Sequence, residues 1–188
     1  MDEDCESSAD ALTAQGGTDT ARWSDVSTYQ QAWTERHALM ATRIRPGDTV
    51  IDLGSGPRVL LQRLPSNCLY VPVDLVPRGP GSIVCDFNRD PPPTMTGDFV
   101  VLSGLIEYLH DPSRLLAAAA AMAPRGAVSY SPLELLPDKH ERRQHGWVND
   151  FTENDFRELL QRAGWKIASI DNWWVQRVFQ VDRREGVM

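Results

Sequence analysis

Residues 50–58 read Val-Ile-Asp-Leu-Gly-Ser-Gly-Pro-Arg, a short apolar run that ends in two glycines. With Thr49 before it, the run 49–53 is short and rich in β-branched residues, as is typical of a buried parallel strand. Gly54 and Gly56 allow a tight turn and a close approach of a ligand to the backbone, and Pro57 suits the start of a short helix. This pattern predicts a ligand site at the carboxyl end of a parallel strand.

The rest of the chain supplies further strands and a few helices around this one. The link 76–81 is rich in proline and glycine and too short for a helix, whereas Asp111 and Thr152 are placed to cap helices that run to Met122 and to Gly164. The last two strands are joined tightly, which favours an antiparallel pair. The predicted fold is therefore α/β: a Rossmann-like, doubly wound, mostly parallel sheet with a C-terminal antiparallel hairpin and some crossover helices reduced to loops. The further strands are expected at residues 68–75, 82–87, 99–103, 127–130, 165–170 and 175–181.

The composition indicates one globular domain. Of the 188 residues, 41% are hydrophobic and 24% are charged. Residues 1–20 hold six acidic side chains and no Lys or Arg, so we expect a disordered acidic tail at 1–20 and a single folded domain over 21–188. Removing those six from the 26 acidic residues leaves 20 against 19 basic ones. The net charge of residues 21–188 is therefore close to zero, which argues against nucleic acid as the main partner.

Other classes of protein are also disfavoured. The longest apolar run, 115–123, is far shorter than the roughly 20 residues that cross a bilayer, so no membrane partner is expected. No secretory leader opens the sequence, and we expect a cytoplasmic location. Cys5, Cys68 and Cys85 are scattered and odd in number, which predicts neither a disulfide framework nor a metal site.

Acidic residues mark the ends of three successive strands. Asp52 ends the first strand, Asp74 ends the next and stands 20 residues after Gly54, and Asp86 precedes Phe87 at the end of the third. An acid in the position of Asp74 accepts hydrogen bonds from ribose hydroxyls in nucleotide-binding folds. A glycine turn alone, or one acid alone, is equally well explained as a turn. Three such positions in the right order predict a nucleoside site.

At this point the chain resembles the class I S-adenosylmethionine-dependent methyltransferases, and the small type-11 group most closely. The resemblance rests on segments in the family's order and covers roughly residues 25–182. They are VIDLGSGPR (50–58), VPVDL (71–75), CDFN (85–88), VVLSGLIEYLHDPSRLL (100–116) and HGWVNDFTENDFRELLQRAGWKI (145–167).

The resemblance implies S-adenosyl-L-methionine as the cofactor and a set of residues that bind it. One group would line the methionine end, a second would hold the ribose and border the adenine, and a third would lie where the fourth strand meets the sulfonium. These groups are, in order, Asp52, Gly54, Ser55 and Gly56; Asp74, Leu75, Asp86 and Phe87; and Ser103, Gly104 and Leu105. Tyr29, before the first strand, is interpreted either as a lid over the cofactor or as a core contact.

Two residues depart from the family pattern. Arg58 stands where the family has a third glycine, and its cation either points outward or crowds or pairs with the cofactor carboxylate. Pro72 lies inside the second strand, where a ladder N–H is lost, so we expect a bulge or a shifted register there.

Methyl transfer needs a general base only when the acceptor must lose a proton. His145 is our first choice as the catalytic base, because it lies in the segment between the fifth strand and the last helix, which should hang over the sulfonium. His140 and His110 are further candidates, with Tyr108 or Tyr130 as orienting groups, and each histidine is also explained as a surface or structural residue. We expect residues 133–149 to shape the acceptor pocket.

The sequence therefore predicts an enzyme that transfers a methyl group from S-adenosyl-L-methionine to oxygen or nitrogen of a small-molecule acceptor, or of a substrate presented by a partner protein. The alternative is a catalytically degenerate methyltransferase fold that serves as a binding or regulatory subunit. A dinucleotide-dependent oxidoreductase would share Gly54, Gly56 and Asp74 but would need a third glycine near Val59 and a substrate domain, and both are absent from this sequence.

Overall fold

Residues 16–25 and 33–185 are described by the structure, a computed structural model of the chain. Its centre is a seven-stranded sheet in the order β3-β2-β1-β4-β5-β7-β6. The strands β1 to β5 are parallel, and β7 is antiparallel to both β5 and β6. The predicted mostly parallel sheet with a C-terminal antiparallel hairpin is confirmed. The strands are β1 (Thr49–Leu53), β2 (Leu69–Asp74), β3 (Ile83–Val84), β4 (Phe99–Leu102), β5 (Arg125–Tyr130), β6 (Trp165–Trp173) and β7 (Gln176–Arg183).

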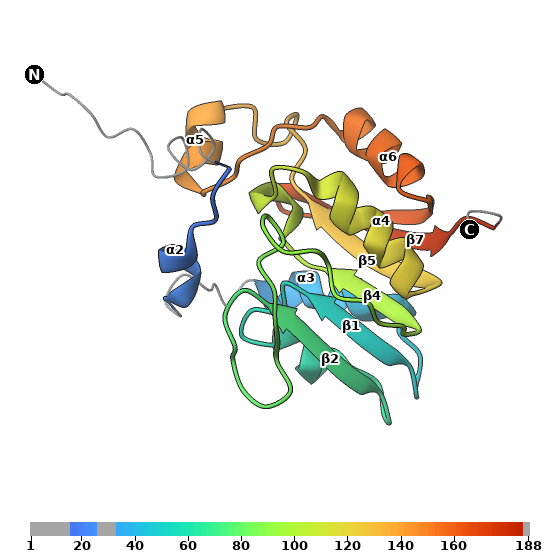
Figure 1. Cartoon of the computed structure of the whole chain (residues 1–188). Helices are drawn as coiled ribbons and strands as arrows, with labels where there is room; N and C mark the ends of the chain where they lie inside the picture. The colour runs from blue at the N-terminus through green and yellow to red at the C-terminus, as the bar shows by residue number, and fades with distance from the viewer. Residues whose placement is uncertain (1–15, 26–32, 186–188) are drawn as a thin grey trace, which may run out of the picture.

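Helices cover both faces of the sheet (Figure 1). On one face lie α4 (Pro112–Met122) and α6 (Glu153–Arg162), and on the other lies α3 (Trp33–Met40) with the 3₁₀ turn η2 (Ala41–Arg43). The crossover from β1 to β2 is only a 3₁₀ turn, η3 (Val59–Arg63), and loops replace the next two crossovers. Shortened crossovers are as predicted. The remaining elements are α2 (Thr20–Ser24), η4 (Ile106–Tyr108) and α5 (Lys139–Gln144).

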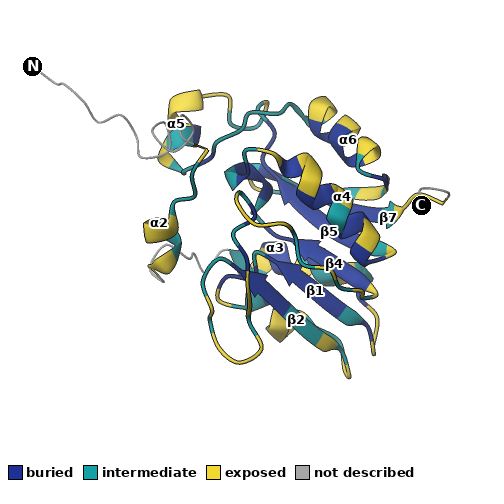
Figure 2. Ribbon diagram, viewed as in Figure 1, coloured by how far each residue is buried: buried dark blue, intermediate teal, exposed yellow. Residues whose placement is uncertain are grey.

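The central strand β4 is apolar throughout because both of its faces are buried (Figure 2). On β4, Phe99 and Val101 pack in the core under α3, whereas Val100 and Leu102 pack in the core under α4 and α6. Side chains of a strand alternate between its faces, so a strand in the middle of a two-sided sheet has no polar face. The polar residue Ser103 follows directly at the carboxyl end of this strand.

The caps of the two helices on the α4 side follow the sequence signals. The Asp111 side chain accepts a hydrogen bond from Ser113 N at 3.1 Å, and Pro112 begins α4. Thr152 and Asp155 form the reciprocal capping box of α6. Such caps stabilise a helix by about 0.5–2 kcal/mol each.

Pro72 does not disturb its strand, so the predicted bulge or register shift is wrong. The pairing of β1 with β2 runs without interruption from Thr49↔Leu69 to Leu53↔Val73. Val73 O accepts hydrogen bonds from the turn after β1, and Asp74 O accepts one from Cys85 N. Backbone groups of successive strand residues point to alternate sides, so Pro72 faces the β3 side, where β3 starts only opposite Val73. No ladder bond is lost there.

No helix among the described residues has both the length and the apolar character needed to span a membrane. Tyr29 falls outside those residues.

Candidate active site

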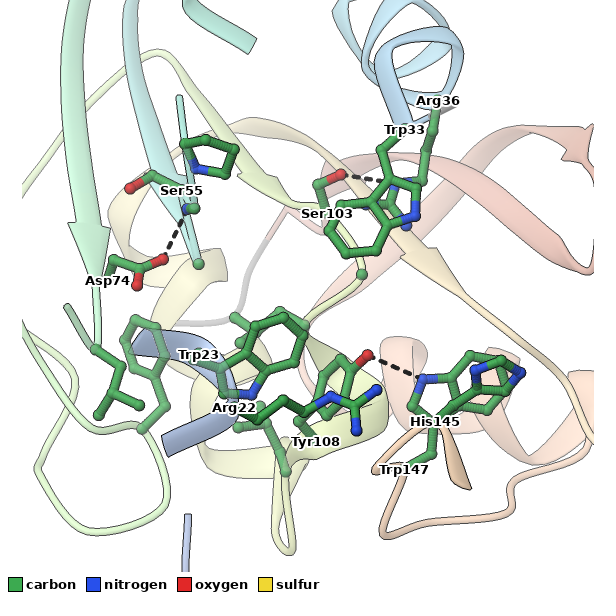
Figure 3. Close-up of a pocket in the computed structure, with 18 of the residues that line it drawn as sticks. Arg22, Trp23, Trp33, Arg36, Ser55, Asp74, Ser103, Tyr108, His145 and Trp147 are labelled. Atoms are coloured by element: carbon green, nitrogen blue, oxygen red, sulfur yellow. Dashed lines mark hydrogen bonds between the residues drawn. The ribbon is translucent and has the colours of Figure 1, made fainter. Parts of the chain in front are cut away.

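A pocket opens at the carboxyl ends of the parallel strands (Figure 3). It brings together residues from the ends of β1, β2, β3 and β4 with the segment after α5. Eleven of the twelve residues predicted for the site line it, and their roles toward ligands stay predictions. They are Gly54, Ser55, Gly56, Asp74, Leu75, Asp86, Phe87, Ser103, Gly104, Leu105 and His145.

The turn after β1 is held against β2 by its backbone. Gly54 N and Ser55 N donate to Val73 O at 2.8 and 3.1 Å. Gly54 has a φ of 75°, and a Cβ added to it would lie 3.1 Å from the Leu105 side chain. Glycine is therefore required both by the backbone conformation and by the close approach of the β4 loop.

Asp74 is fixed at the end of β2 with its carboxylate on the pocket wall. Oδ2 accepts a hydrogen bond from Gly56 N at 2.7 Å, and Oδ1 accepts one from Val76 N at 3.1 Å. A carboxylate retains further acceptor capacity after two such bonds. Asp74 is thus oriented by the turn and can still accept hydrogen bonds from a ligand.

Asp86 and Phe87 follow the two-residue strand β3. The Oδ1 atom of Asp86 accepts hydrogen bonds from Thr18 Oγ1 at 2.7 Å and from Asn88 N at 3.1 Å. Phe87 is buried and packs in the main core, while still contributing to the pocket lining. An acid and an aromatic ring therefore lie side by side at the third strand end.

Arg36 is a functional candidate that the sequence analysis missed. It comes from α3, is only 4% exposed, and lines the pocket. Its Nε donates to Ser103 Oγ at 3.0 Å, and its Nη1 donates to Gln176 Oε1 at 2.9 Å. The guanidinium carbon lies 5.3 Å from the ring centroids of both Trp33 and Trp173. A buried, stacked cation at the end of β4 is thus part of the pocket wall.

Burial lowers the pKa of Arg36 to about 10, and nearby Glu107 opposes this shift. Arg36 is therefore a cation at neutral pH. Gly104 gives it room, because a Cβ on this residue (φ 60°) would lie 2.6 Å from Arg36 Nη1. Trp33 and Arg36 are three positions apart, so both lie on one side of the helix. This spacing of an aromatic residue and a cation is the sequence signal that could have identified Arg36.

Glu107 supports Arg36 from behind the pocket. Gln176 Nε2 donates to Glu107 Oε1 at 2.9 Å, and Ser131 N donates to the same oxygen at 2.9 Å. Burial raises the pKa of Glu107. Gln176 therefore links a buried cation to a buried carboxyl group, and this chain of hydrogen bonds fixes the guanidinium in place.

Asp52 is the one predicted cofactor residue that does not line the pocket. It is buried, and its Oδ2 accepts a hydrogen bond from the Tyr70 hydroxyl on the neighbouring strand at 2.6 Å. Burial raises the pKa of Asp52 to about 7. Its carboxyl group is therefore bound to Tyr70 rather than on the pocket wall, and its role at the methionine end stays a prediction.

His145 lies across the pocket from Asp74 (Figure 3). It ends α5, and its ring centroid lies 5.0 Å from that of Trp147. Trp147 Nε1 donates to the Tyr108 hydroxyl at 3.1 Å, and burial raises the pKa of Tyr108 to about 12. Trp147 and Tyr108 also line the pocket. An imidazole therefore stands beside two fixed aromatic side chains.

The other base candidates lie elsewhere. His110 Nε2 is 2.9 Å from Gly17 O, and His140 Nε2 is 3.1 Å from Gln144 Nε2, and neither histidine lines the pocket. Tyr130, predicted as an orienting group, is buried and donates to Asn149 Oδ1 at 2.9 Å, also away from the pocket wall. Among the predicted bases, His145 alone lines the pocket in the described part of the chain.

Residues 16–25 form a strap that contributes to the pocket wall. Its helix α2 lies beyond the carboxyl ends of the strands (Figure 1). Thr18, Arg22 and Trp23 line the pocket, and the Trp23 ring packs edge-on against Tyr108 with 4.6 Å between centroids. Trp23 O accepts a hydrogen bond from the Arg78 guanidinium. Residues 16–20, which we expected to belong to the tail, thus contact the domain, while 1–15 lie outside the described residues.

Arg58 points away from the pocket. It adopts a left-handed backbone conformation with φ 61°, and its Nη2 donates to Gly79 O, Pro80 O and Ser82 Oγ at 2.9, 3.0 and 2.5 Å. Of the alternatives left open by the sequence, the outward orientation is the one observed. The cation anchors the loop after β2 and leaves the space beside Gly54 open.

Comparison with known proteins places the chain in a family. The family described as "Methyltransferase domain" matches residues 26–170, which is more than half of the chain. The chain belongs to this methyltransferase family. The predicted membership of the class I methyltransferases is therefore confirmed. None of the curated proteins matches the chain.

Solved structures share the fold of this methyltransferase. A chain of the complex between the Haloferax volcanii Trm112 methyltransferase activator and a putative methyltransferase is 17% identical, with a TM-score of 0.67 over 97% of this chain and 100% of that one. The Burkholderia thailandensis 1,6-didemethyltoxoflavin-N1-methyltransferase, with 1,6-didemethyltoxoflavin and S-adenosylhomocysteine bound, is 18% identical, with a TM-score of 0.67 over 98% and 94% of the two chains. At such identities the likeness shows the fold.

Proposed function

We propose that this methyltransferase transfers a methyl group from S-adenosyl-L-methionine to oxygen or nitrogen of a small-molecule acceptor. The observation that carries the proposal is the convergence of four successive strand ends on one pocket. Open α/β sheets bind ligands in such a crevice. The bound S-adenosylhomocysteine of the Burkholderia neighbour supports the choice of cofactor.

The donor set of the pocket suits each part of this cofactor. The Asp74 carboxylate suits the ribose hydroxyls, and Asp86 with Phe87 suits the adenine. The Gly54 turn leaves the backbone open to close approach, since a Cβ there would meet Leu105. Arg36 supplies a buried cation for the carboxylate of the methionine part.

When bound, S-adenosyl-L-methionine supplies an electrophilic methyl group on sulfur. The protein residues hold donor and acceptor in line, an effect worth up to about 7–11 kcal/mol. The cofactor would give up its methyl group to the acceptor atom and leave as the neutral thioether, and His145 would accept the proton that a hydroxyl acceptor loses. Trp147 stands against the His145 ring and orients it.

Two measurements test this function. Titration calorimetry with S-adenosylhomocysteine should show one site, and transfer of a labelled methyl group from S-adenosylmethionine into a pool of small metabolites should yield a labelled product. Absence of binding by either form of the cofactor would exclude the proposed function. Binding with no transfer to any acceptor would favour the alternative, a regulatory subunit.

One observation favours a protein partner as the second candidate. Three large apolar side chains are exposed at the β2–β3 edge of the sheet: Leu69 (65%), Ile83 (37%) and Val84 (58%). Exposed apolar residues on an edge strand suit docking of another protein. The Haloferax neighbour comes from a complex with a methyltransferase activator. In this second candidate function, the partner protein would present the substrate to the pocket, or would depend on the cofactor that this chain binds.

A further inference from the structure

The half of the pocket away from Asp74 is walled by aromatic rings. The chain has six tryptophans, and five of them line the pocket. They come from four separate segments, and Tyr108 adds a further ring. The tryptophans are Trp23, Trp33, Trp147, Trp173 and Trp174. Flat, rigid side chains on several sides favour a planar aromatic ligand, because stacked or edge-on rings attract one another beyond the gain from area burial.

The charges of the pocket are divided between its halves. Its acidic lining residues, Asp74 and Asp86, both follow strands at the nucleoside half. The aromatic half holds Arg22 and Arg36, and no carboxylate side chain among the described lining residues lies there. The two guanidiniums already face tryptophan rings, at 5.9 Å from Trp23 and 5.3 Å from Trp33. A cationic acceptor would be repelled, and an anionic one attracted.

Arg22 is the cation with hydrogen-bonding capacity to spare. Its Nη1 donates to Gln144 O at 3.4 Å, which is a long bond, and Nη2 donates to none of the described residues. Its Nε is buried without a partner there, and Arg22 alone among the residues with such an orphaned atom lines the pocket. A buried donor without an acceptor is unfavourable, and Nη2 of the same guanidinium can still donate to a ligand oxygen.

Arg22 is also well held for this task. The Asp19 carboxylate accepts a hydrogen bond from Arg22 N at 3.0 Å and caps α2, and Trp23 packs against Tyr108. The guanidinium lies beside the segment of His145, since a Cβ on Gly146 would be 3.4 Å from Arg22 Nη1. The cation and the proposed base therefore face the same part of the pocket (Figure 3).

We propose that the acceptor is a planar aromatic compound that carries a carboxylate, and that Arg22 binds this carboxylate. The inference rests on the proposed function and names the substrate class of that site. Arg36 is engaged by Ser103 and Gln176 at the end of β4, next to the methionine part of the proposed cofactor. Arg22 is left for the acceptor, and the strap 16–25 is then part of the acceptor site.

The test uses the whole chain saturated with S-adenosylhomocysteine and two probes of the same shape. One is 2-naphthoate, and the other is its uncharged counterpart 2-naphthamide. Titration calorimetry should show that the protein binds 2-naphthoate at least tenfold more tightly. In Arg22→Gln the affinity for 2-naphthoate should fall at least tenfold and become similar to the affinity for 2-naphthamide. The affinity for 2-naphthamide should be the same in the variant as in the unaltered protein.

Two further variants complete the design. Arg22→Lys should keep part of the preference for 2-naphthoate, because it keeps the charge but loses the bidentate geometry. Arg162→Gln, at an exposed arginine on α6, should bind both probes as the unaltered protein does. Equal binding of the two probes, no binding of 2-naphthoate, or an equal loss of both in Arg22→Gln would overturn the proposal. S-Adenosylhomocysteine is titrated first, so a failure of the proposed function is recognised separately.

Discussion

The backbone N–H of Gly56 donates to the Asp74 carboxylate at 2.7 Å, which joins the glycine turn after β1 to the end of β2. One side chain thus has two tasks: it fixes the turn and presents an acceptor to the pocket. The relationship explains how a turn with Arg58 in place of a third glycine keeps its shape. Loss of the carboxylate should affect the turn and ligand binding together.

Asp74→Ala should weaken binding of S-adenosylhomocysteine by about 1–3 kcal/mol, because the ribose hydroxyls lose their acceptor and the turn loses its anchor. Titration calorimetry measures the effect. Glu158→Ala, which removes an exposed acid from α6, is the matched control and should leave the dissociation constant unchanged. An unaltered constant in Asp74→Ala would mean that the ribose is held by other groups.

Arg36→Gln should weaken S-adenosylhomocysteine binding by about tenfold or more, since a charge-assisted hydrogen bond to the methionine carboxylate is lost. The nucleoside 5′-methylthioadenosine lacks that carboxylate, and its affinity should change little. Comparing the two ligands separates loss of a charge pair from a general disturbance of the pocket. A parallel loss for both ligands would assign Arg36 to structure alone.

His145→Ala should spare cofactor binding and lower kcat by about 10²–10⁴-fold with an acceptor that must lose a proton. His140→Ala, at a histidine outside the pocket, is the matched control and should retain full activity. Steady-state kinetics with the labelled methyl donor measure both variants. Full activity in His145→Ala would remove this residue as the base.

Much of this architecture could be predicted because local signals agreed with it. The apolar run 49–53 is β1 residue for residue, and the caps at Asp111 and Thr152 begin α4 and α6 as their patterns predicted. Sequence order along parallel strands then placed the acids at one edge of the sheet. Eleven residues accordingly meet at the pocket.

Other features depend on contacts between distant segments, which local patterns do not encode. Asp52 is hydrogen-bonded to Tyr70, which lies 18 positions away on the neighbouring strand. Pro72 was tolerated because β3 is too short to pair with it. Arg36 is hydrogen-bonded to Ser103, which is 67 positions away, and Thr18 is hydrogen-bonded to Asp86, which is 68 positions away. None of these pairings has a periodicity that a single sequence displays.

The buried Asp52 gives the protein a pH-dependent stability. Its pKa in the folded state is raised to about 7 from 3.8, chiefly by burial. The unfolded chain therefore releases this proton near pH 4, whereas the folded protein keeps it until about pH 7. The stabilising contribution is complete below pH 4 and is lost as the pH rises from about 4 to 7.

Asp52→Asn should abolish this loss of stability between about pH 4 and 7, because the amide is uncharged and can still accept the hydrogen bond from Tyr70. Relative to the unaltered protein, the variant should gain free energy of unfolding as the pH rises from 4.5 to 7, and the gain should stay constant above pH 7. Urea denaturation at pH 4.5, 6 and 8 measures it. If the free energies of unfolding of the variant and the unaltered protein differ by the same amount at all three pH values, Asp52 is ionised in the folded protein at each of them.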